Sequence, residues 1–554
     1  MKHGLNREKH DSMLTAAFAA LVLSLAFRIP LMSVIGAEGV AFLAPVNELF
    51  LLGMAFFGNG LSEAVSGMVR YRSKREQYKN AHRVFRAALN ITVIAAFLIA
   101  VFILVFHSYI CRVIFLENFS RLPLLLIVPA LVFMAFTCLL RGYFQGMGSH
   151  YPTVHSLILE QLFSFTLGIL FAIYFLDYGQ KVAAILRDQS FASTYGAMGA
   201  ALGISLAAVI AFLHLLLIYY IYGRSIKQRI YDDTTRQMET PGFLYQSLLW
   251  QAIPFGAVMV LYQANNLIDQ RFFYYFTNEL ANVGEVAGDK ATVWGNYYGL
   301  FLPVVGIFAA LTCFTRDKAA KNIAAAWMRE EYGAVREHLM YAVQICVIVT
   351  IPLAVLVAVL AEPLVFLLGQ GSSEVAARLL QSGSAMIVFL AFSLFWLSLL
   401  KQFKKTLWLL VMAVGGLAVH IVALWLLLSR AEAAEGLILR VVAANLISFG
   451  FMFLVGFFLV TRWVNYTGDL MNRNLRTLIV TLLCSAVAGL MAMLLAMGIR
   501  TLIGSALTVL VCSAVALTAY TILMMLLRGL TAAELDRLPG GQVLVRLGRL
   551  MRFM

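Results

Sequence analysis

Long apolar stretches alternate with short charged segments along almost the whole chain. An α-helix needs about 20 apolar residues to cross the ~30 Å hydrocarbon core of a bilayer. By this criterion the pattern predicts about fourteen membrane-spanning helices. They are placed near residues 13–35, 40–69, 87–107, 122–140, 152–175, 195–222, 244–270, 291–313, 338–361, 379–400, 406–429, 437–461, 477–499 and 503–527.

The composition supports the bilayer as the surroundings of these helices. Of the 554 residues, 62% are hydrophobic and 13% are charged, and the mean hydropathy is +0.86. A soluble domain leaves too much of its surface in water to hide so much apolar area. We therefore expect an all-α polytopic membrane protein.

The distribution of cations sets the predicted orientation. The net charge is +14, but the Lys and Arg residues gather in short segments between spans, which indicates membrane topology rather than nucleic-acid binding. Segment 70–86 is the richest of them and is predicted to face the cytoplasm. With an even number of spans, both basic ends of the chain, at Lys2 and Arg549, are then cytoplasmic. We read charged segments such as 70–86 and 316–336 as surface helices on anionic membrane lipids.

A weak internal repeat suggests the domain organisation. Cys138–Arg141 opens the turn after the fourth predicted span, and the similar Ser398–Lys401 opens the turn after the tenth. An offset of six spans preserves orientation and predicts two pseudo-symmetric six-helix lobes, a pattern found in transporters. The predicted parts are an N-lobe of residues 1–230, a C-lobe of residues 231–465, and a segment 466–554 with two further spans and a basic tail.

The turn after the fourth span carries a family resemblance. Arg141-Gly142-Tyr143-Phe144-Gln145-Gly146, with Pro152-Thr153 and Glu160-Gln161 after it, resembles the signature of the MOP exporter superfamily. The similar branch is that of the polysaccharide and oligosaccharidyl-lipid flippases, with the lipid II flippases and stage V sporulation protein B. Further similar segments are Phe27–Pro30 with Ile35–Gly39, Arg83–Arg86, and Ile253-Pro254 with Leu267–Asp269.

The chain departs from the branch in its second span. The branch usually has a Gly-x-Pro-x-Ala-x-Ser-Lys pattern there, whereas this chain has Ser62 in place of the proline and Gly67 in place of the lysine. Glu63 adds an acid. These changes fall on spans expected to line the cavity, so they bear on the substrate rather than on the fold.

Arg28 is the central candidate for substrate binding. A cation at the centre of a bilayer costs about 2.5–3.5 kcal/mol on insertion scales, so it is expected to face a wet cavity or an acid. A guanidinium binds phosphate in a bidentate manner, which favours contact with an anionic headgroup. The alternative is a structural ion pair with Glu48 or Glu63. Glu48 and Glu63 are also the candidates for coupling to a proton or a sodium ion. The alternative is that Glu48 lies at the outer membrane interface and Glu63 caps the inner end of the span.

Arg141 and Glu160 form the preferred hypothesis for a cytoplasmic gate, together with Gln145 and Gln161 of the same motif. The simpler alternative is that Arg141 anchors the topology beside a tight glycine-rich turn. At the predicted outer end of the seventh span, Asn265, Asn266, Asp269 and Arg271 are expected to form an outer gate or to contact the headgroup. Exposed ion pairs of that kind contribute only ~0–1 kcal/mol. Glu38, in the turn after the first span, completes the predicted substrate-binding set.

The resemblance implies a flippase that works by alternating access in a bacterial cytoplasmic membrane. Its substrate would be a lipid-linked saccharide, a precursor of peptidoglycan or of a polysaccharide, whose headgroup enters the cavity between the lobes near Arg28. A multidrug or cation antiporter of the same superfamily is the alternative, and an intramembrane glycolipid-modifying enzyme is a third.

No Walker A, zinc-protease or nucleophile-elbow motif occurs in the sequence. We expect no catalytic residue, metal or cofactor, and coupling to H⁺, Na⁺ or the membrane potential. Cell-envelope glycosyltransferases are the expected protein partners.

Overall fold

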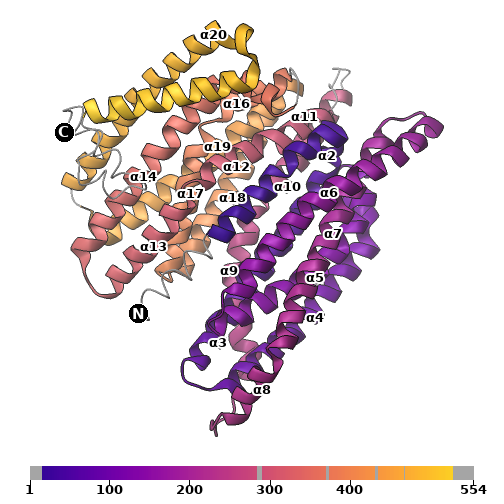
Figure 1. Ribbon diagram of the computed structural model, residues 1–554, viewed down its shortest axis with the longest axis vertical. Helices are drawn as coiled ribbons and strands as arrows, with labels where there is room; N and C mark the ends of the chain where they lie inside the picture. The colour runs from indigo at the N-terminus through magenta and orange to yellow at the C-terminus, as the bar shows by residue number, and fades with distance from the viewer. Residues whose placement is uncertain (1–14, 283–289, 370–372, 431–433, 467, 528–554) are drawn as a thin grey trace. The chain divides into compact units, whose positions relative to one another are not determined.

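The computed structural model describes residues 15–282, 290–369, 373–430, 434–466 and 468–527 (Figure 1). The basic ends at Lys2 and Arg549 lie outside these ranges. The described chain is almost entirely helical and contains no strand. The predicted all-α class is therefore confirmed, as expected for segments whose backbone groups must be satisfied within lipid.

The number of spans is close to the prediction. Among the described residues, 12 helices are long and apolar enough to cross a membrane, or 13 if the bent pair α16 (Glu374–Gly383) and α17 (Met386–Gln402) is one span. One of the 12 is the run Thr15–Ser73 of 59 residues. A straight helix of that length would measure about 90 Å, roughly three times the hydrocarbon thickness. Gly36, with φ 73° and ψ 171°, breaks this run between the first two predicted spans.

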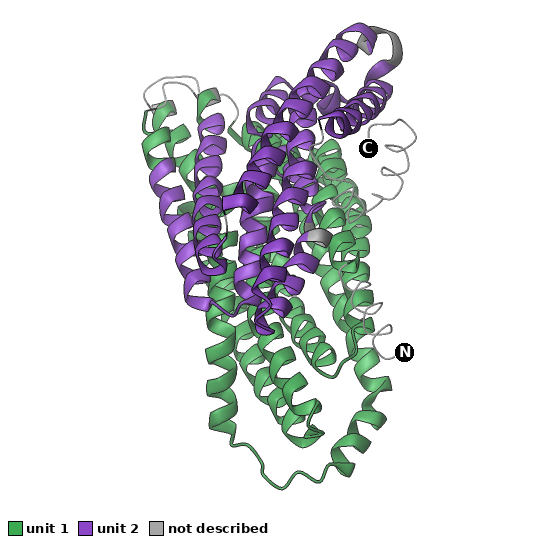
Figure 2. Ribbon diagram, turned by 90° about the vertical axis from the view of Figure 1, so that its left-hand side faces the viewer, with its two compact units in different colours: residues 1–300, 424–437 green, residues 301–423, 438–554 purple. Residues whose placement is uncertain are grey.

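The chain forms two compact units, shown in green and purple in Figure 2. Unit 1 contains residues 1–300 and 424–437, and unit 2 contains residues 301–423 and 438–554. The predicted lobe boundaries at 230 and 465 stay a prediction. The helices of unit 1 are residues 15–26, α2 (Arg28–Met54), η1 (Ala55–Leu61), α3 (Ser62–Ser73), α4 (Tyr78–Tyr109), η2 (Ile110–Phe115), η3 (Asn118–Ser120), α5 (Arg121–Gly146), α6 (Tyr151–Leu186), α7 (Ser190–Ile221), α8 (Gly223–Asp232), α9 (Pro241–Gln263), α10 (Asn265–Asn282) and α11 (Lys290–Asn296).

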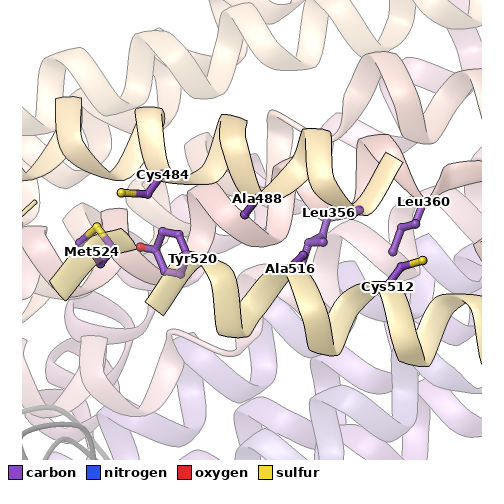
Figure 3. Packing of buried hydrophobic residues seen from close by; sticks show 9 residues of the cluster. Leu356, Leu360, Cys484, Ala488, Cys512, Ala516, Tyr520 and Met524 are labelled. Carbon is purple, nitrogen blue, oxygen red and sulfur yellow. The ribbon is translucent and has the colours of Figure 1, made fainter. Parts of the chain in front are cut away.

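Unit 2 is built around the packing of α14 (Tyr332–Val359) against α20 (Gly468–Leu526). α20 is broken at Gly504, with φ 66° and ψ 163°, so its two arms are separate candidate spans. Cys484 and Ala488 from the first arm and Cys512 and Ala516 from the second join one apolar cluster with Leu356 of α14 (Figure 3). The remaining helices of this unit are α12 (Leu302–Ala310), α13 (Cys313–Met328), α15 (Ala361–Leu367), α16, α17, and most of α18 (Thr406–Leu428) and α19 (Ala434–Val464); η4 (Tyr297–Phe301) spans the boundary between the units.

A polar connector fastens the segment between α8 and α9 to the rest of unit 1. Arg72 donates two hydrogen bonds to Glu239 Oε2, at 2.9 Å from Nε and 2.6 Å from Nη2. The backbone N–H of Lys79 donates to Asp233 Oδ2 at 2.7 Å. Burial alone would raise the pKa of Asp233, but the bonds from Lys79 and Thr235 outweigh it and lower that pKa. The connector therefore holds the start of α9 beside α3 and α4.

Small residues let α6 and α7 approach closely, and the two helices lie side by side in Figure 1. A Cβ added at Gly203 would collide with the backbone of Gly168 on the other helix, and one at Gly179 would lie 2.7 Å from Tyr195 Cβ. Helices in lipid associate through such close van der Waals packing because the solvent is itself apolar.

Substitution of Gly203 tests this packing. Gly203→Ala is expected to destabilise the protein by about 1–3 kcal/mol, because an overpacked helix pair must separate. Gly67→Ala is the matched control, since a Cβ at Gly67 meets no atom within 4 Å. Thermal unfolding in detergent should show a lower Tm for Gly203→Ala and an unchanged or higher Tm for Gly67→Ala. Equal Tm values for the two variants would contradict the close approach.

Candidate functional site

Arg28 lies at the start of α2 and is buried, with 6% of its surface exposed. Its guanidinium stacks on the Tyr298 ring, with 4.0 Å from Cζ to the ring centroid, and its Nη2 lies 3.6 Å from Glu48 Oε1. Arg28 and Glu48 are 20 positions apart, which would separate them by about 30 Å in a straight helix. The break at Gly36 folds the chain back and brings the two charges together.

Glu48 is the centre of a buried hydrogen-bond network. The Tyr298 hydroxyl donates to Glu48 Oε1 at 2.7 Å, and Gln263 Nε2 donates to Oε2 at 2.6 Å. Asn47 Nδ2 in turn donates to the Tyr298 hydroxyl at 2.9 Å. Both carboxylate oxygens are thereby satisfied, as an ion buried at 1% exposure requires. This arrangement agrees with the ion-pair alternative for Arg28 and names Glu48 as its partner.

A cavity of about 210 Å³ opens beside this network. Arg28, Asn47 and Tyr298 line one part of it, and Glu160 and Gln161 of α6 line another. Among the described residues, no hydrogen-bond partner lies within reach of the buried Arg28 Nε. An N–H group desolvated in this way is costly unless a ligand or water accepts from it. The cavity therefore holds a cation with unused donor capacity.

Arg141 and Glu160 form a buried ion pair. Arg141 Nη2 lies 2.7 Å from Glu160 Oε2, and Arg141 Nε donates to Ser156 Oγ at 2.8 Å. The structure thus contains the predicted pair, while its role as a gate stays a prediction. Because Glu160 also lines the Arg28 cavity, the pair connects the α5–α6 turn with the candidate substrate site.

The predicted residues of α10 do not line this cavity. Asp269 is fully buried and accepts a hydrogen bond from the Tyr297 hydroxyl at 3.4 Å. Asn265 is buried and Asn266 is half-buried. Arg271 is exposed and donates to the backbone carbonyl of Val113.

Glu38, Glu63 and Gln145 also lie outside the lining of the Arg28 cavity. Glu38 is half-buried and accepts from Ser193 Oγ at 2.7 Å, and Gln145 Nε2 donates to Thr153 Oγ1 at 3.4 Å. Glu63 is exposed in the first turn of α3. The π-helix η1 separates it from Glu48, and the wider turns of a π-helix change which positions share a face. The α-helical spacing therefore cannot be used to decide whether Glu48 and Glu63 lie on the same face.

Three residues of the network were missed by sequence reasoning: Asn47, Gln263 and Tyr298. Asn47 stands beside Glu48 in an apolar span, so a polar pair at that depth was the available signal. Gln263 and Tyr298 are more than 200 positions from Glu48, and no local pattern links residues at such separations.

The fold is similar to that of multi-span membrane transporters of the MOP superfamily. The lipid II flippase MurJ, in an inward closed conformation, superimposes with a TM-score of 0.63 at 14% identity, covering 93% of this chain and 98% of that one. An inward-facing multidrug resistance MATE family transporter of the MOP superfamily superimposes with a TM-score of 0.60 at 15% identity, covering 81% and 96%. At these identities the likeness shows the fold alone.

Sequence comparison points to the same group of proteins. Stage V sporulation protein B from Bacillus subtilis (strain 168) is 27% identical over 217 residues. The match spans 39% of this chain and 39% of that protein, so it covers about two fifths of the relative's length. No protein-family model matches the chain. The predicted resemblance to the MOP superfamily is confirmed.

Proposed function

We propose that the protein is a flippase that moves a lipid-linked saccharide from the inner to the outer leaflet of a bacterial cytoplasmic membrane. The observation that carries this proposal is Arg28, a buried guanidinium that lines a cavity of about 210 Å³ and whose Nε has no hydrogen-bond partner among the described residues. A phosphate or diphosphate is the chemical group that best satisfies it, because guanidinium matches phosphate oxygens in a bidentate manner.

Glu48 would hold Arg28 in place between transport events. At 3.6 Å the ion pair is longer than the hydrogen bonds that Glu48 accepts from Tyr298 and Gln263. An arriving phosphate would bind the free Nε side of Arg28 while Glu48 keeps its two neutral donors. In this scheme substrate binding leaves neither Arg28 nor Glu48 without a partner, so it avoids the large cost of a buried unpaired ion.

The membrane potential is the proposed driving force. Moving one charge across 100 mV changes the free energy by about 2.3 kcal/mol, so a doubly charged diphosphate would gain about 4.6 kcal/mol on export. The proposal places both chain termini in the cytoplasm, the polyisoprenoid tail in the bilayer, and the headgroup in the cavity during alternating access. Anionic membrane lipids and cell-envelope glycosyltransferases are its proposed partners.

A cation antiporter is the second candidate. The observation that favours it is Glu160, a carboxylate on the same cavity as Arg28, together with Glu48 close by. Multidrug resistance transporters share the fold. The pairing of Glu160 with Arg141 at 2.7 Å weighs against it, since the carboxylate charge is already compensated.

Ligand-induced stabilisation distinguishes the two functions. A ligand present at 100 times its Kd stabilises the folded state by about 2.7 kcal/mol, which is measurable as a rise in Tm. We expect undecaprenyl diphosphate to raise the Tm of the purified protein, and undecaprenol, the same tail without phosphate, to leave it unchanged. A lipophilic drug cation should have no effect. Stabilisation by the cation alone would favour the antiporter and contradict the flippase.

A further inference from the structure

A second cavity lies in unit 1 at the turn between α5 and α6. Its volume is about 240 Å³, and it is bounded by this turn and by α8. Tyr143, Ser149, Tyr151, Ser225 and Arg229 are among its lining residues. None of these residues lines the Arg28 cavity.

The first turn of α6 opens onto this cavity. This helix is 36 residues long, has Pro152 in its first turn, and has no side-chain cap at its N-terminus. The N–H groups at the start of a helix have no intrahelical acceptor, and the helix dipole favours an anion beside them. Pro152 has no N–H group, and the Val154 N–H bonds to the His150 carbonyl. The N–H groups of Tyr151 and Thr153 are therefore the donors that this turn offers to a negatively charged group.

Tyr143 supplies an independent donor at the same place. It is buried, with 1% of its surface exposed, and its ring packs on Phe85 with a centroid distance of 4.6 Å. No hydrogen bond joins its hydroxyl to any residue that the structure describes. The cavity it lines also presents Arg229, which is near enough to act electrostatically on this hydroxyl.

Arg229 supplies the positive charge. It lies on α8, which has no buried residue, and the described chain offers it no ion-pair partner. Its guanidinium stands over the Tyr78 ring at 5.8 Å. The exposed tyrosines nearby in sequence, Tyr220 at 83% and Tyr231 at 87%, are typical of the membrane–water interface. A basic amphipathic helix at that depth meets lipid headgroups.

We propose that this cavity binds the phosphate of an anionic phospholipid headgroup at the predicted cytoplasmic surface. Arg229 would pair with the phosphate, while the Tyr143 hydroxyl and the N–H groups of Tyr151 and Thr153 donate hydrogen bonds to its oxygens. Ser149 and Ser225 would contact the glycerol part of the headgroup. The site shares no lining residue with the Arg28 cavity and does not depend on which substrate the protein carries.

Native mass spectrometry of the full-length protein, reconstituted with phosphatidylcholine and phosphatidylglycerol, tests this site. The matched pair of variants is Arg229→Gln and Arg224→Gln, which remove the same charge from α8. Arg224 does not line the cavity. We expect wild type and Arg224→Gln to retain one phosphatidylglycerol after delipidation, and Arg229→Gln to retain it at least about tenfold less. A tenfold loss corresponds to about 1.4 kcal/mol.

Tyr143→Phe should weaken retention several-fold, while circular dichroism shows an unchanged helix content. Equal lipid loss in Arg224→Gln and Arg229→Gln would overturn the proposal, because the effect would then be general surface attraction. A second arm adds inorganic phosphate to the delipidated wild type. If the protein retains inorganic phosphate in place of phosphatidylglycerol, the lipid assignment is overturned. If phosphate displaces the bound phosphatidylglycerol only at high concentrations, the assignment is supported.

Discussion

Replacing Arg28 with Gln is expected to reduce the transport rate by at least about tenfold and to leave the protein folded. The substitution removes the cation that would bind the substrate phosphate, and a tenfold loss corresponds to only about 1.4 kcal/mol of binding. Removing one partner of a buried ion pair costs about 3–5 kcal/mol when the other charge is left alone. Here Glu48 keeps the bonds from Tyr298 and Gln263, so we expect a smaller cost. Transport is measured in proteoliposomes, and folding by Tm.

A double variant separates the functional role of Arg28 from its structural role. In Arg28→Gln with Glu48→Gln, both charges of the pair are gone, so the Tm should return toward the wild-type value. Transport should stay lost, because the cation is still absent. Arg28→Lys should recover little activity, since an ammonium neither stacks on Tyr298 as a guanidinium does nor binds phosphate in a bidentate manner. Full activity in the double variant would show that Arg28 serves the fold alone.

Replacing Glu160 is expected to have the second-largest effect. In Glu160→Gln the side chain can still accept a hydrogen bond from Arg141, so protein yield should be maintained while transport falls several-fold. In Glu160→Ala the Arg141 guanidinium is left buried with the Ser156 hydroxyl as its hydrogen-bond partner. Removing one partner of a buried ion pair costs about 3–5 kcal/mol. Glutamine offsets part of this cost because its carbonyl still accepts the hydrogen bond from Arg141, whereas alanine offsets none of it. We therefore expect the alanine variant to lose both stability and activity.

The comparison of the two Glu160 variants decides whether the pair acts as a gate. Transport rates are normalised to the amount of folded protein, determined by size-exclusion chromatography. A gate requires Glu160→Gln to be slow although it is as abundant as wild type. If Glu160→Gln transports at the wild-type rate, the pair serves only to hold the α5–α6 turn against α6.

The spans were predictable because the bilayer dictates them. A segment that must cross ~30 Å of hydrocarbon as a helix has to be both long and apolar, and both properties can be read residue by residue. The turn at Ile35–Gly39 was anticipated between two such segments, and the positive φ of Gly36 shows why glycine stands there. The pairing of Arg141 with Glu160 was within reach because 19 positions and one turn separate them.

The Arg28 network was less accessible to sequence reasoning. Glu48 could be named as one of two candidate partners, but the two residues that donate to its carboxylate come from α9 and from η4, far along the chain. Their positions depend on how whole helices pack, which polar residues in an apolar sequence do not encode locally. The π-helix η1 also affects the placement of Glu63 relative to Glu48, because it interrupts the α-helical periodicity between these two residues.

The most direct test of the proposed function is the leaflet accessibility of a labelled undecaprenyl-diphosphate-linked saccharide in proteoliposomes. Label on the inner leaflet is protected from a membrane-impermeant quencher or enzyme, so its exposure with time reports movement between leaflets. We predict that wild-type protein exposes the label, faster when a membrane potential favours outward movement of anions, and that Arg28→Gln does not. No movement of the lipid by the wild-type protein at any potential, combined with efflux of a drug cation, would contradict the proposal.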